Sequence, residues 1–237
     1  MGRLTTPKRL GIMGGMGPMA TVDLYSKITA LTPANCDQEH IPIVIDSFPQ
    51  IEDRTAYILT QNESPLDKMI ESATRLEKAG AEALLIACNT AHYFAEPIQQ
   101  KIDIPIISII DAVIEKIEDH NAVATERKLK KIVVLATNGT IKSKLYQTKL
   151  ELCGFEVVNM NQSQQDILMD CIYLGAKAGK IDEYQIAFQK LIDNIEADAY
   201  VAACTEIPLF IPNLKGEHYI IDATLELAKK AIKFALS

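Results

Sequence analysis

No stretch of this 237-residue chain approaches 18 consecutive apolar residues, so the sequence predicts no membrane-spanning helix. The spacings Cys-x-x-Cys and His-x-x-x-His are both absent, and the four histidines do not have the arrangement of a zinc site. We therefore expect no bound metal. The first residues, MGRLTTPKRLGIMGG, lack the long apolar core of a signal peptide, because their short apolar run soon meets glycine. We expect a chain without a signal peptide.

Positively charged residues are fewer than negatively charged ones. The chain has 24 Lys and Arg against 31 Asp and Glu, which gives a net charge of −7 and a pI near 5.2. Nucleic-acid phosphates need a positive protein surface, so we expect no nucleic-acid partner. The five cysteines are odd in number and scattered, which is typical of reduced thiols. These features predict a cytoplasmic protein that acts on a small molecule.

The remaining composition is that of a globular protein, with 48% apolar and 23% charged residues. Short apolar segments alternate with helical patterns throughout, which predicts an α/β fold with largely parallel sheets. The expected strands cover residues 8–13, 41–48, 82–88, 104–110, 130–136, 155–158, 199–204 and the segment from 218. The expected helices cover residues 18–31, 64–80, 90–101, 141–152, 164–175, 182–195, a segment from 111 and the end of the chain.

The helix at residues 64–80 carries the clearest start and stop signals. Ser64 is the expected N-cap and Pro65 lies in the first turn. Gly80 follows the expected end, where glycine is favoured.

Three short motifs occur twice in the same order. They are GGMGP…LY with ATNGT…LY, ACNT with ACTE, and SIIDA with YIIDA. The pairs that they align are Tyr25 with Tyr146, Cys88 with Cys204, and Asp111 with Asp222. We interpret the repeat as two similar, pseudo-symmetric α/β lobes. The first would comprise residues 1–113 plus 216–237 and the second residues 114–215, with the active site in the cleft between them.

The repeated cysteines suggest the chemistry. Cys88 and Cys204 each end an apolar strand, and each precedes a predicted helix whose free N–H groups would favour a thiolate. A thiolate and a thiol on opposite sides of a carbon acid can remove the α-proton from one face and return a proton to the other. That reaction inverts a stereocentre without a cofactor. Cys36, Cys153 and Cys171 lack this context and are expected to pack as small apolar residues.

Other residue types complete such a site. The carbanion needs preorganised hydrogen-bond donors, for which residues 14–18, Asn89, Thr90 and residues 137–139 are candidates. A second substrate carboxylate needs a cation, and Arg54 and Lys177 are the candidates. His92 could tune Cys88, and Glu206 could orient Cys204 or hold the substrate ammonium. A purely structural role is equally open for His92 and Glu206.

Seven motifs in order along nearly the whole chain resemble the aspartate racemases of the cofactor-independent aspartate/glutamate racemase superfamily. They are GGMGPMAT, DQEHIP, PQIEDRT, ACNTAH, ATNGT, IYLGAKAG and ACTEIPL. The resemblance implies two pseudo-symmetric lobes, no cofactor and a homodimer. It also implies a catalytic pair, Cys88 and Cys204, and the substrate-binding residues Met16, Arg54, Asn89, Thr90 and Lys177. Thr137 and Thr205 are further candidate substrate-binding residues.

The motifs also bear on the substrate. Glutamate racemases carry Asp-Ser at the glycine loop and Cys-Thr-His at the second cysteine, whereas this chain has GGMGP and ACTE. These differences favour aspartate, and a broad-specificity amino-acid racemase remains the alternative. Hydantoin racemases, maleate isomerases and arylmalonate decarboxylases fit the motifs less well.

Two other classes of function also have some support in the sequence. Residues 15–20 match the dinucleotide pattern G-x-G-x-x-A, with Asp46 as a ribose-binding acid, but this pattern explains neither the second cysteine nor the repeat. A non-catalytic amino-acid sensor would also have two lobes around a cleft. Reactive thiols at both strand ends argue for turnover instead, because such thiols are easily oxidised.

Overall fold

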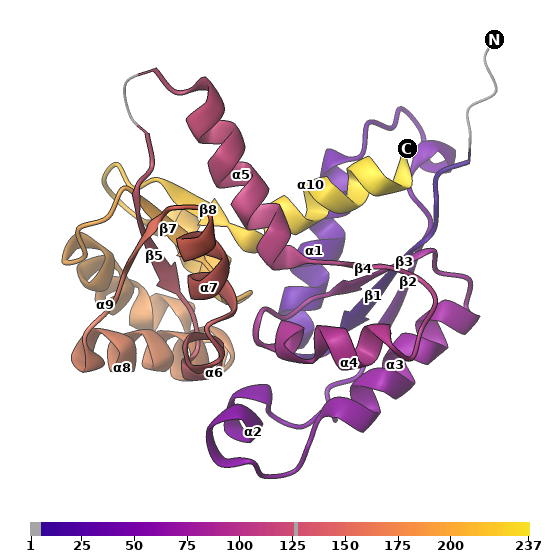
Figure 1. The fold of residues 1–237 in the computed structure, drawn as a ribbon, viewed down its shortest axis with the longest axis horizontal. Helices are drawn as coiled ribbons and strands as arrows, with labels where there is room; N and C mark the ends of the chain where they lie inside the picture. Colours follow the sequence, from indigo (N-terminus) through magenta and orange to yellow (C-terminus); the bar gives the residue numbers. More distant parts are fainter. Residues whose placement is uncertain (1–5, 126–127) are drawn as a thin grey trace. The chain divides into compact units, whose positions relative to one another are not determined.

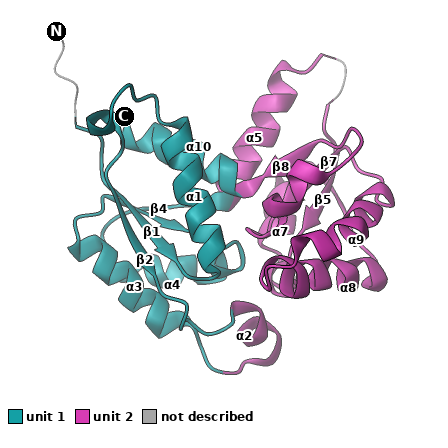
Figure 2. Ribbon diagram, turned by 180° about the vertical axis from the view of Figure 1, so that it is seen from behind, with its two compact units in different colours: residues 1–53, 63–109, 224–237 teal, residues 54–62, 110–223 magenta. Residues whose placement is uncertain are grey.

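The computed structural model describes residues 6–125 and 128–237. Residues 1–5, part of the segment in which no signal peptide is expected, lie outside the described residues. The chain forms two compact units (Figure 2). Unit 1 comprises residues 1–53, 63–109 and 224–237, and unit 2 comprises residues 54–62 and 110–223. Each unit is built around one parallel sheet of four strands.

The sheet of unit 1 has the strand order β2-β1-β3-β4 (Figure 1). Its strands are β1 (Leu10–Gly14), β2 (Ile43–Ser47), β3 (Ala83–Ile86) and β4 (Ile106–Ile107). All residues of β1 and β3 are buried, as expected for central strands covered on both faces. The helices of this unit are α1 (Pro18–Leu31), a 3₁₀-helix (Asp37–Glu39), α3 (Leu66–Lys78), a 3₁₀-helix (Thr90–Phe94), α4 (Ala95–Gln99) and α10 (Ala223–Ala235).

The sheet of unit 2 has the corresponding order β6-β5-β7-β8. Its strands are β5 (Lys131–Leu135), β6 (Glu156–Val158), β7 (Ala199–Ala202) and β8 (Ile220–Asp222). The helices are α2 (Arg54–Thr60), α5 (Ile109–Val123), α6 (Asn138–Ser143), α7 (Leu145–Leu152), α8 (Gln162–Asp170), a π-helix (Cys171–Ala176), α9 (Ile181–Asp193) and a 3₁₀-helix (Ile207–Asn213). The expected fold class, α/β with parallel sheets in two similar lobes, is confirmed.

The shared strand order shows where the internal repeat holds. Cys88 lies two residues after β3 and Cys204 two residues after β7, so both cysteines follow the third strand of their sheet. The two copies of the IIDA motif are not structurally equivalent, because the first begins helix α5 while the second forms strand β8. Asp111 and Asp222 therefore do not occupy equivalent positions.

The unit boundaries differ from the expected ones in three places, one of which is that residues 110–113, expected in the first lobe, belong to unit 2. Strand β8 pairs with β7, so residues 216–223 belong to unit 2 rather than to the first lobe. Residues 54–62, expected in the first lobe, also belong to unit 2, because α2 packs against α6. Helix α10 lies in unit 1.

Several elements start or end elsewhere than the sequence suggested. Pro65, not Ser64, is the N-cap of α3, although the Ser64 hydroxyl accepts a hydrogen bond from the Leu66 N–H (3.3 Å). The expected helix at 90–101 is a 3₁₀-turn followed by α4, and the expected strand at 104–110 shortens to β4. The expected helix at 141–152 begins earlier, at Asn138, and is divided at Lys144 into α6 and α7. The expected helix at 164–175 becomes α8 and the π-helix.

Candidate active site

The glycine loop after β1 lies at the carboxyl edge of the sheet of unit 1. Here the Thr21 hydroxyl accepts a hydrogen bond from the Gly15 N–H (2.9 Å) and donates one to the Gly17 carbonyl (3.2 Å). Gly15 has a φ of +89°, and a Cβ there would meet the backbone of Phe48 at 2.5 Å. Only glycine therefore allows this turn. The loop buries Met16, a predicted substrate-binding residue.

Cys88 lies beside this loop within unit 1. The Ala87 N–H donates to the Met13 carbonyl (3.0 Å), which holds the end of β3 against the end of β1. Cys88 is 6% exposed, and the predicted donors Asn89 and Thr90 are buried directly after it. A regular α-helix begins only at Ala95, because residues 90–94 form a 3₁₀-turn. The long helix expected behind Cys88 is therefore absent from the described structure.

His92 has a structural role in this turn. Its Nε2 accepts a hydrogen bond from the Ile109 N–H (3.2 Å), so the proton of the neutral ring lies on Nδ1. Nδ1 then donates to the carbonyl oxygen of Cys88 (2.9 Å). Both ring nitrogens hold backbone groups in place, and neither hydrogen bond reaches the Cys88 sulfur. Of the two roles considered for His92, the geometry favours the structural one.

In unit 2, helix α2 brings Arg54 and Thr137 to one region. Thr137 caps α6 by accepting the N–H of Thr140 (3.4 Å), and the Thr55 hydroxyl donates to the Thr137 hydroxyl (3.2 Å). Gly139 permits this close packing, because a Cβ there would lie 2.8 Å from the Thr55 Cα. Arg54, the residue before Thr55, is buried in α2 and is not a solvated surface side chain.

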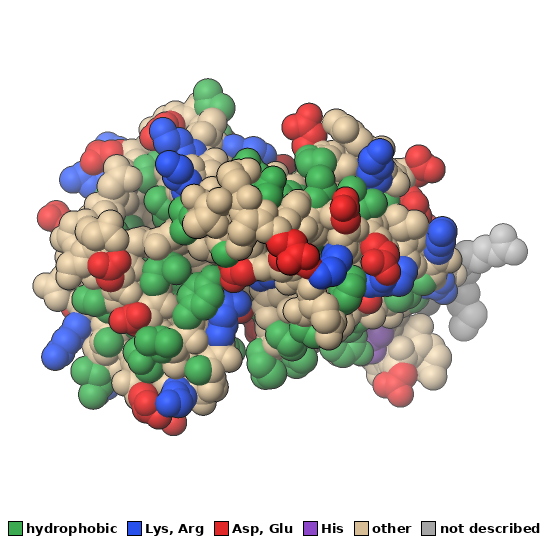
Figure 3. Space-filling model, turned by 90° about the horizontal axis from the view of Figure 1, so that it is seen from below, with side chains coloured by type: hydrophobic (Ala, Val, Ile, Leu, Met, Phe, Trp, Pro, Cys, Tyr) green, Lys and Arg blue, Asp and Glu red, His purple; other side chains and the backbone are tan. Residues whose placement is uncertain are grey.

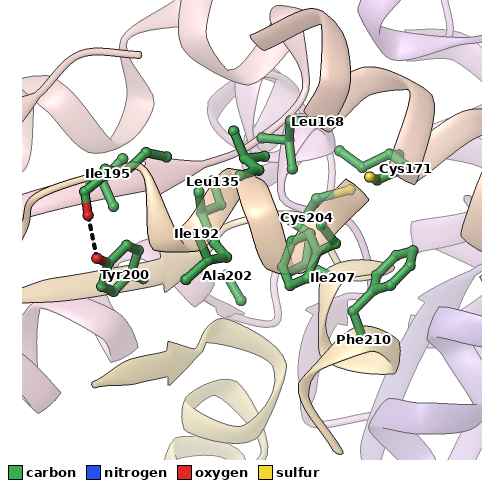
Figure 4. Packing of buried hydrophobic residues seen from close by; sticks show 14 of the residues in the cluster. Leu135, Leu168, Cys171, Ile192, Ile195, Tyr200, Ala202, Cys204, Ile207 and Phe210 are labelled. Atoms are coloured by element: carbon green, nitrogen blue, oxygen red, sulfur yellow. Dashed lines mark hydrogen bonds between the residues drawn. The ribbon is translucent and has the colours of Figure 1, made fainter. Parts of the chain in front are cut away.

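Cys204 lies at the adjacent strand end of the same unit. The Ala203 N–H donates to the Leu135 carbonyl (2.9 Å), which joins the ends of β7 and β5. Figure 4 shows the Cys204 side chain among apolar side chains that include Leu168 and Ile207. Its thiol donates a hydrogen bond to Glu206 Oε2 (3.1 Å).

Glu206 is the centre of a buried polar cluster. The Thr205 hydroxyl donates to the same Oε2 atom (3.2 Å), and the Lys177 ammonium pairs with Oε1 (3.2 Å). The Glu206 side chain is 6% exposed and that of Lys177 is 25% exposed. One carboxylate thus accepts hydrogen bonds from the thiol and the hydroxyl and forms an ion pair with the ammonium. We call Lys177, Cys204, Thr205 and Glu206 the Glu206 cluster.

A π-helix places Lys177 in this cluster. The Lys177 N–H donates to the Ile172 carbonyl five residues earlier (3.0 Å), which is the hydrogen-bond pattern of a π-helix. Its ammonium also lies 5.5 Å from the ring centroid of Tyr173. The wider helical turn shifts Lys177 relative to a continuous α-helix, and such turns are frequent at functional sites.

The surroundings of Cys204 favour its protonated form. Burial raises the pKa of the Cys204 thiol well above its usual range, and the negative charge of Glu206 raises it further. Lys177 lowers the pKa of Cys204, but less strongly. At neutral pH the described surroundings therefore hold Cys204 as a thiol.

The other cysteines differ among themselves. Cys171 is buried as expected, and burial raises the pKa of its thiol to about 11. Cys36 and Cys153 are exposed, which contradicts the expectation that they pack as apolar residues. Cys36 is the N-cap of the 3₁₀-helix Asp37–Glu39, and Cys153 is the C-cap of α7. The described residues contain no group that could hold a metal ion and no helix long and apolar enough to cross a bilayer.

Comparison with known proteins decides the family. The sequence profile described as Asp/Glu/hydantoin racemase matches residues 13–231. The chain belongs to this family. It is 30% identical to the broad-specificity amino-acid racemase RacX of Bacillus subtilis (strain 168) over 236 residues, which cover 96% of this chain and 98% of RacX.

Solved structures agree with this assignment. The fold matches an aspartate racemase from Picrophilus torridus with a TM-score of 0.83 and 30% identity, over 96% of this chain and 94% of that one. It also matches an aspartate racemase homologue from Pyrococcus horikoshii OT3 with a TM-score of 0.73 and 26% identity, over 97% and 100% of the two chains. The expected enzyme class, an isomerase that racemises amino acids, is confirmed.

Each unit contains part of the predicted site. Unit 1 contains Met16, Cys88, Asn89, Thr90 and His92, and unit 2 contains Arg54, Thr137, Lys177, Cys204, Thr205 and Glu206. Thr55, Thr140 and Thr21 support these residues and were not predicted. The spacing Thr137-x-x-Thr140 at a helix start was an available signal for one of them. Asp46, the acid in the dinucleotide reading, forms an ion pair with Arg75 (2.7 Å).

Proposed function

We propose that this chain interconverts L- and D-aspartate by two-base proton transfer at the α-carbon, with Cys88 and Cys204 as the two catalytic residues. The observation that carries the proposal is the equivalent placement of the two thiols. Each is buried, and each follows the third strand of a sheet with the same strand order. Family membership supports the reaction class.

The proposed steps balance in protons and electrons. One cysteine, as a thiolate, takes the α-proton: the Cα–H bond breaks, an S–H bond forms, and the electron pair is delocalised into the α-carboxylate. The other cysteine, as a thiol, gives its proton to the opposite face of Cα, and its own S–H bond breaks. The two cysteines have then exchanged protonation states, and the product is the opposite enantiomer.

We assign Cys204 the thiol role in the resting enzyme, because burial and Glu206 both favour its protonated form. When the reaction requires a Cys204 thiolate, the Glu206 carboxylate at 3.1 Å can accept the thiol proton. The S–H bond then breaks and an O–H bond forms on Glu206. Before the α-proton is removed the pair therefore holds one proton, on sulfur when Cys204 acts as the acid and on Glu206 when Cys204 acts as the base.

The remaining residues are assigned to the substrate. Asn89, Thr90 and the backbone near Met16 would donate to the α-carboxylate as negative charge develops there. Thr137 and Thr205 would add donors from unit 2. Arg54 and Lys177 would hold the second carboxylate, and the buried position of Arg54 suits such a role because buried guanidinium groups bind carboxylates strongly.

Two observations bear on specificity. The structure of the aspartate racemase from Picrophilus torridus is matched with a TM-score of 0.83 over 94% of that chain, whereas that of a glutamate racemase from Campylobacter jejuni is matched with a TM-score of 0.66 over 85% of that chain. Aspartate is therefore the first candidate substrate. RacX, matched over 98% of its length, is named a broad-specificity racemase, so broad specificity is the second candidate.

The reaction needs no cofactor, because both proton carriers are side chains of the chain itself. All five cysteines are free, and the mechanism fails if Cys88 or Cys204 is oxidised. We therefore propose a reducing compartment, the cytoplasm, as the site of action.

The test of function is racemisation of single enantiomers, followed by chiral chromatography. L-Aspartate should yield a racemic mixture, and glutamate and neutral amino acids should react more slowly. Comparable rates on several amino acids would favour the broad-specificity candidate. Binding of aspartate with no racemisation of any amino acid would contradict the proposal and favour a sensor.

A further inference from the structure

Unit 2 contains a cavity of about 320 Å³ whose lining comes from β5, α6, α7, α8, α2 and the end of β6. No candidate active-site residue is among the described residues that line it. Two of the lining residues, Leu59 and Asn138, belong to α2 and α6, the helices that begin at Arg54 and directly after Thr137. Figure 3, which views the molecule from below, shows hydrophobic side chains interspersed with lysines and arginines on the side where α6 and α8 lie. A volume above about 300 Å³ is sufficient for a small-molecule site.

The lining combines apolar side chains with carboxamides. The carboxamides are those of Asn138, Gln147, Asn159, Gln162 and Gln165. The apolar side chains are those of Leu59, Val134, Ile141, Val157, Val158 and Met160. Lys142 is the only charged residue among the described residues of the lining, and it forms no ion pair within the part of the chain that the structure describes. Such a lining fits a ligand with an apolar body, amide-type hydrogen-bonding groups and a negative charge.

Gln147 is the strongest indication that this cavity binds a ligand. It is 8% exposed and lies with Tyr146 and Leu150 on the buried face of α7. Its Oε1 atom is buried and has no hydrogen-bond partner among the described residues. A buried amide oxygen that is left unpaired lowers stability, whereas a leucine of similar size would fill the position without this cost. Gln147 is therefore better suited to accept a hydrogen bond from an occupant of the cavity than to pack in the core.

The distribution of the carboxamides fits a secondary amide. The N–H and C=O groups of a trans amide point in opposite directions, so the amide needs an acceptor on one side and a donor on the other. Gln147 Oε1 is a free acceptor, and the Nδ2 groups of Asn138 and Asn159 are donors on other elements of the lining. Gln165 can only accept, because its Nε2 already donates to the Ala136 carbonyl (2.9 Å).

Lys142 determines the charge of the ligand. Its ammonium favours a carboxylate, and an ammonium on the ligand would find no acidic residue among the described residues of the lining. Free amino acids, including the aspartate proposed as substrate, carry an α-ammonium group and are therefore poorly suited to this cavity. Acylation of the amino group removes the positive charge and creates the secondary amide.

We propose that this cavity is a second ligand site, which binds an N-acylated amino acid with an aliphatic side chain. The amide N–H of the ligand donates to Gln147 Oε1, and its carboxylate pairs with Lys142. The aliphatic side chain packs against the apolar lining, which includes Val158 and Met160. The proposal concerns binding and does not depend on the proposed activity.

Binding of N-acetyl-L-leucine to the full chain, followed by ligand-observed NMR, tests this proposal. We expect saturable binding with a dissociation constant of about 0.1–5 mM, the range for a ligand of this size. L-Leucine has an ammonium in place of the amide, and N-acetyl-L-leucinamide lacks the carboxylate. Each should bind at least about fivefold more weakly than N-acetyl-L-leucine. Saturating aspartate should not displace the probe, because the candidate active site is separate.

A peptide with the same end group distinguishes the two sources of this chemistry. Gly-Gly-Gly-Leu carries the terminal amide and carboxylate of N-acetyl-L-leucine on a longer chain. It should bind no more tightly, because a cavity of about 320 Å³ has room for a single acylated residue. Tighter binding of the peptide would overturn the assignment to a small molecule.

Variants test whether the probe occupies this cavity. Gln147→Leu should raise the dissociation constant at least about fivefold without lowering the midpoint of thermal unfolding, because it removes an unpaired buried atom. Lys142→Met should abolish the preference for N-acetyl-L-leucine over N-acetyl-L-leucinamide. Gln185→Leu is the matched control. Gln185 also lies in unit 2 and has a buried Oε1 without a partner among the described residues, but it does not line the cavity. Its replacement should leave the affinity within about twofold of wild type.

Several results would overturn the proposal. They are the absence of saturable binding up to about 20 mM, equal binding of L-leucine, and displacement of the probe by aspartate. Unchanged affinity or a lower unfolding midpoint in Gln147→Leu would also contradict it, as would an equal loss of binding in Gln185→Leu.

Discussion

Replacing Glu206 by glutamine removes the proton acceptor of Cys204 while preserving the size of the side chain. In the wild type, one oxygen of the Glu206 carboxylate accepts a hydrogen bond from the Cys204 thiol (3.1 Å). The other oxygen forms an ion pair with the Lys177 ammonium (3.2 Å). Glutamine has only one oxygen and cannot take up a proton at neutral pH. Its NH₂ group must face either the ammonium or the thiol.

Glu206→Gln should change the catalytic rate and the stability by amounts that can be measured separately. General acid–base groups contribute about 10²- to 10⁴-fold to rate, so we expect kcat to fall by about 100-fold, equivalent to about 2.7 kcal/mol. The free energy of unfolding should fall by only about 1–3 kcal/mol, because the Lys177 side chain is 25% exposed and water can partly replace its lost partner. The variant should therefore remain folded.

The assay is the rate of aspartate racemisation, measured by polarimetry from both enantiomers as a function of pH. The negative charge of Glu206 raises the pKa of Cys204, so the variant should move the limb of the pH profile that reports Cys204 to lower pH. Glu226→Gln is the matched control. Glu226 is also buried and pairs with a lysine, Lys229 at 2.8 Å, but it lies on α10 in unit 1.

The reasoning would be refuted by a Glu206→Gln enzyme whose kcat stays within about threefold of wild type, below the contribution of a general acid–base group. An unmoved pH profile would also contradict it, because a purely structural role for Glu206 predicts lower stability without a shift in pH dependence. Loss of rate in Glu226→Gln to the same extent would show that the effect is not specific to the Glu206 cluster.

Three further predictions follow from the described contacts. His92→Ala should lower the free energy of unfolding by about 1–3 kcal/mol in thermal or urea unfolding, because it leaves the Ile109 N–H without its acceptor, and the pH profile of the remaining activity should be unchanged. Gly139→Ala should destabilise the chain by about 1–3 kcal/mol in thermal or urea unfolding, since its Cβ would lie 2.8 Å from the Thr55 Cα. Cys171 ionises less readily in the folded state, so its contribution to stability is complete below the usual thiol pKa and is lost as pH rises toward about 11; Cys171→Ala should lack this part of the alkaline decline in urea titrations.

The candidate cysteines could be predicted from sequence because their signal is local. A buried parallel strand is a short apolar run, and Cys88 and Cys204 stand directly after two such runs. The repetition of the motif then distinguished these two thiols from Cys171, which is equally buried. The same locality explains why the order of strands and helices was largely predictable.

Other features depend on contacts between distant residues. Helix α2 follows unit 1 in sequence, yet it packs on α6, so Arg54 belongs to unit 2. The IIDA motif is helical in one copy and a strand in the other, which shows that four identical letters do not determine local structure. The π-helix that ends just before Lys177 also has no sequence pattern that distinguishes it from an α-helix.

The most direct test of the central claim, one catalytic thiol in each unit, is proton NMR of L-aspartate with the enzyme in deuterated water. The wild type should exchange the α-proton for deuterium while D-aspartate accumulates, and the D-aspartate formed should carry deuterium from its first appearance. Cys88→Ala and Cys204→Ala should each abolish racemisation while remaining folded. Racemisation at the wild-type rate by either variant would contradict the account.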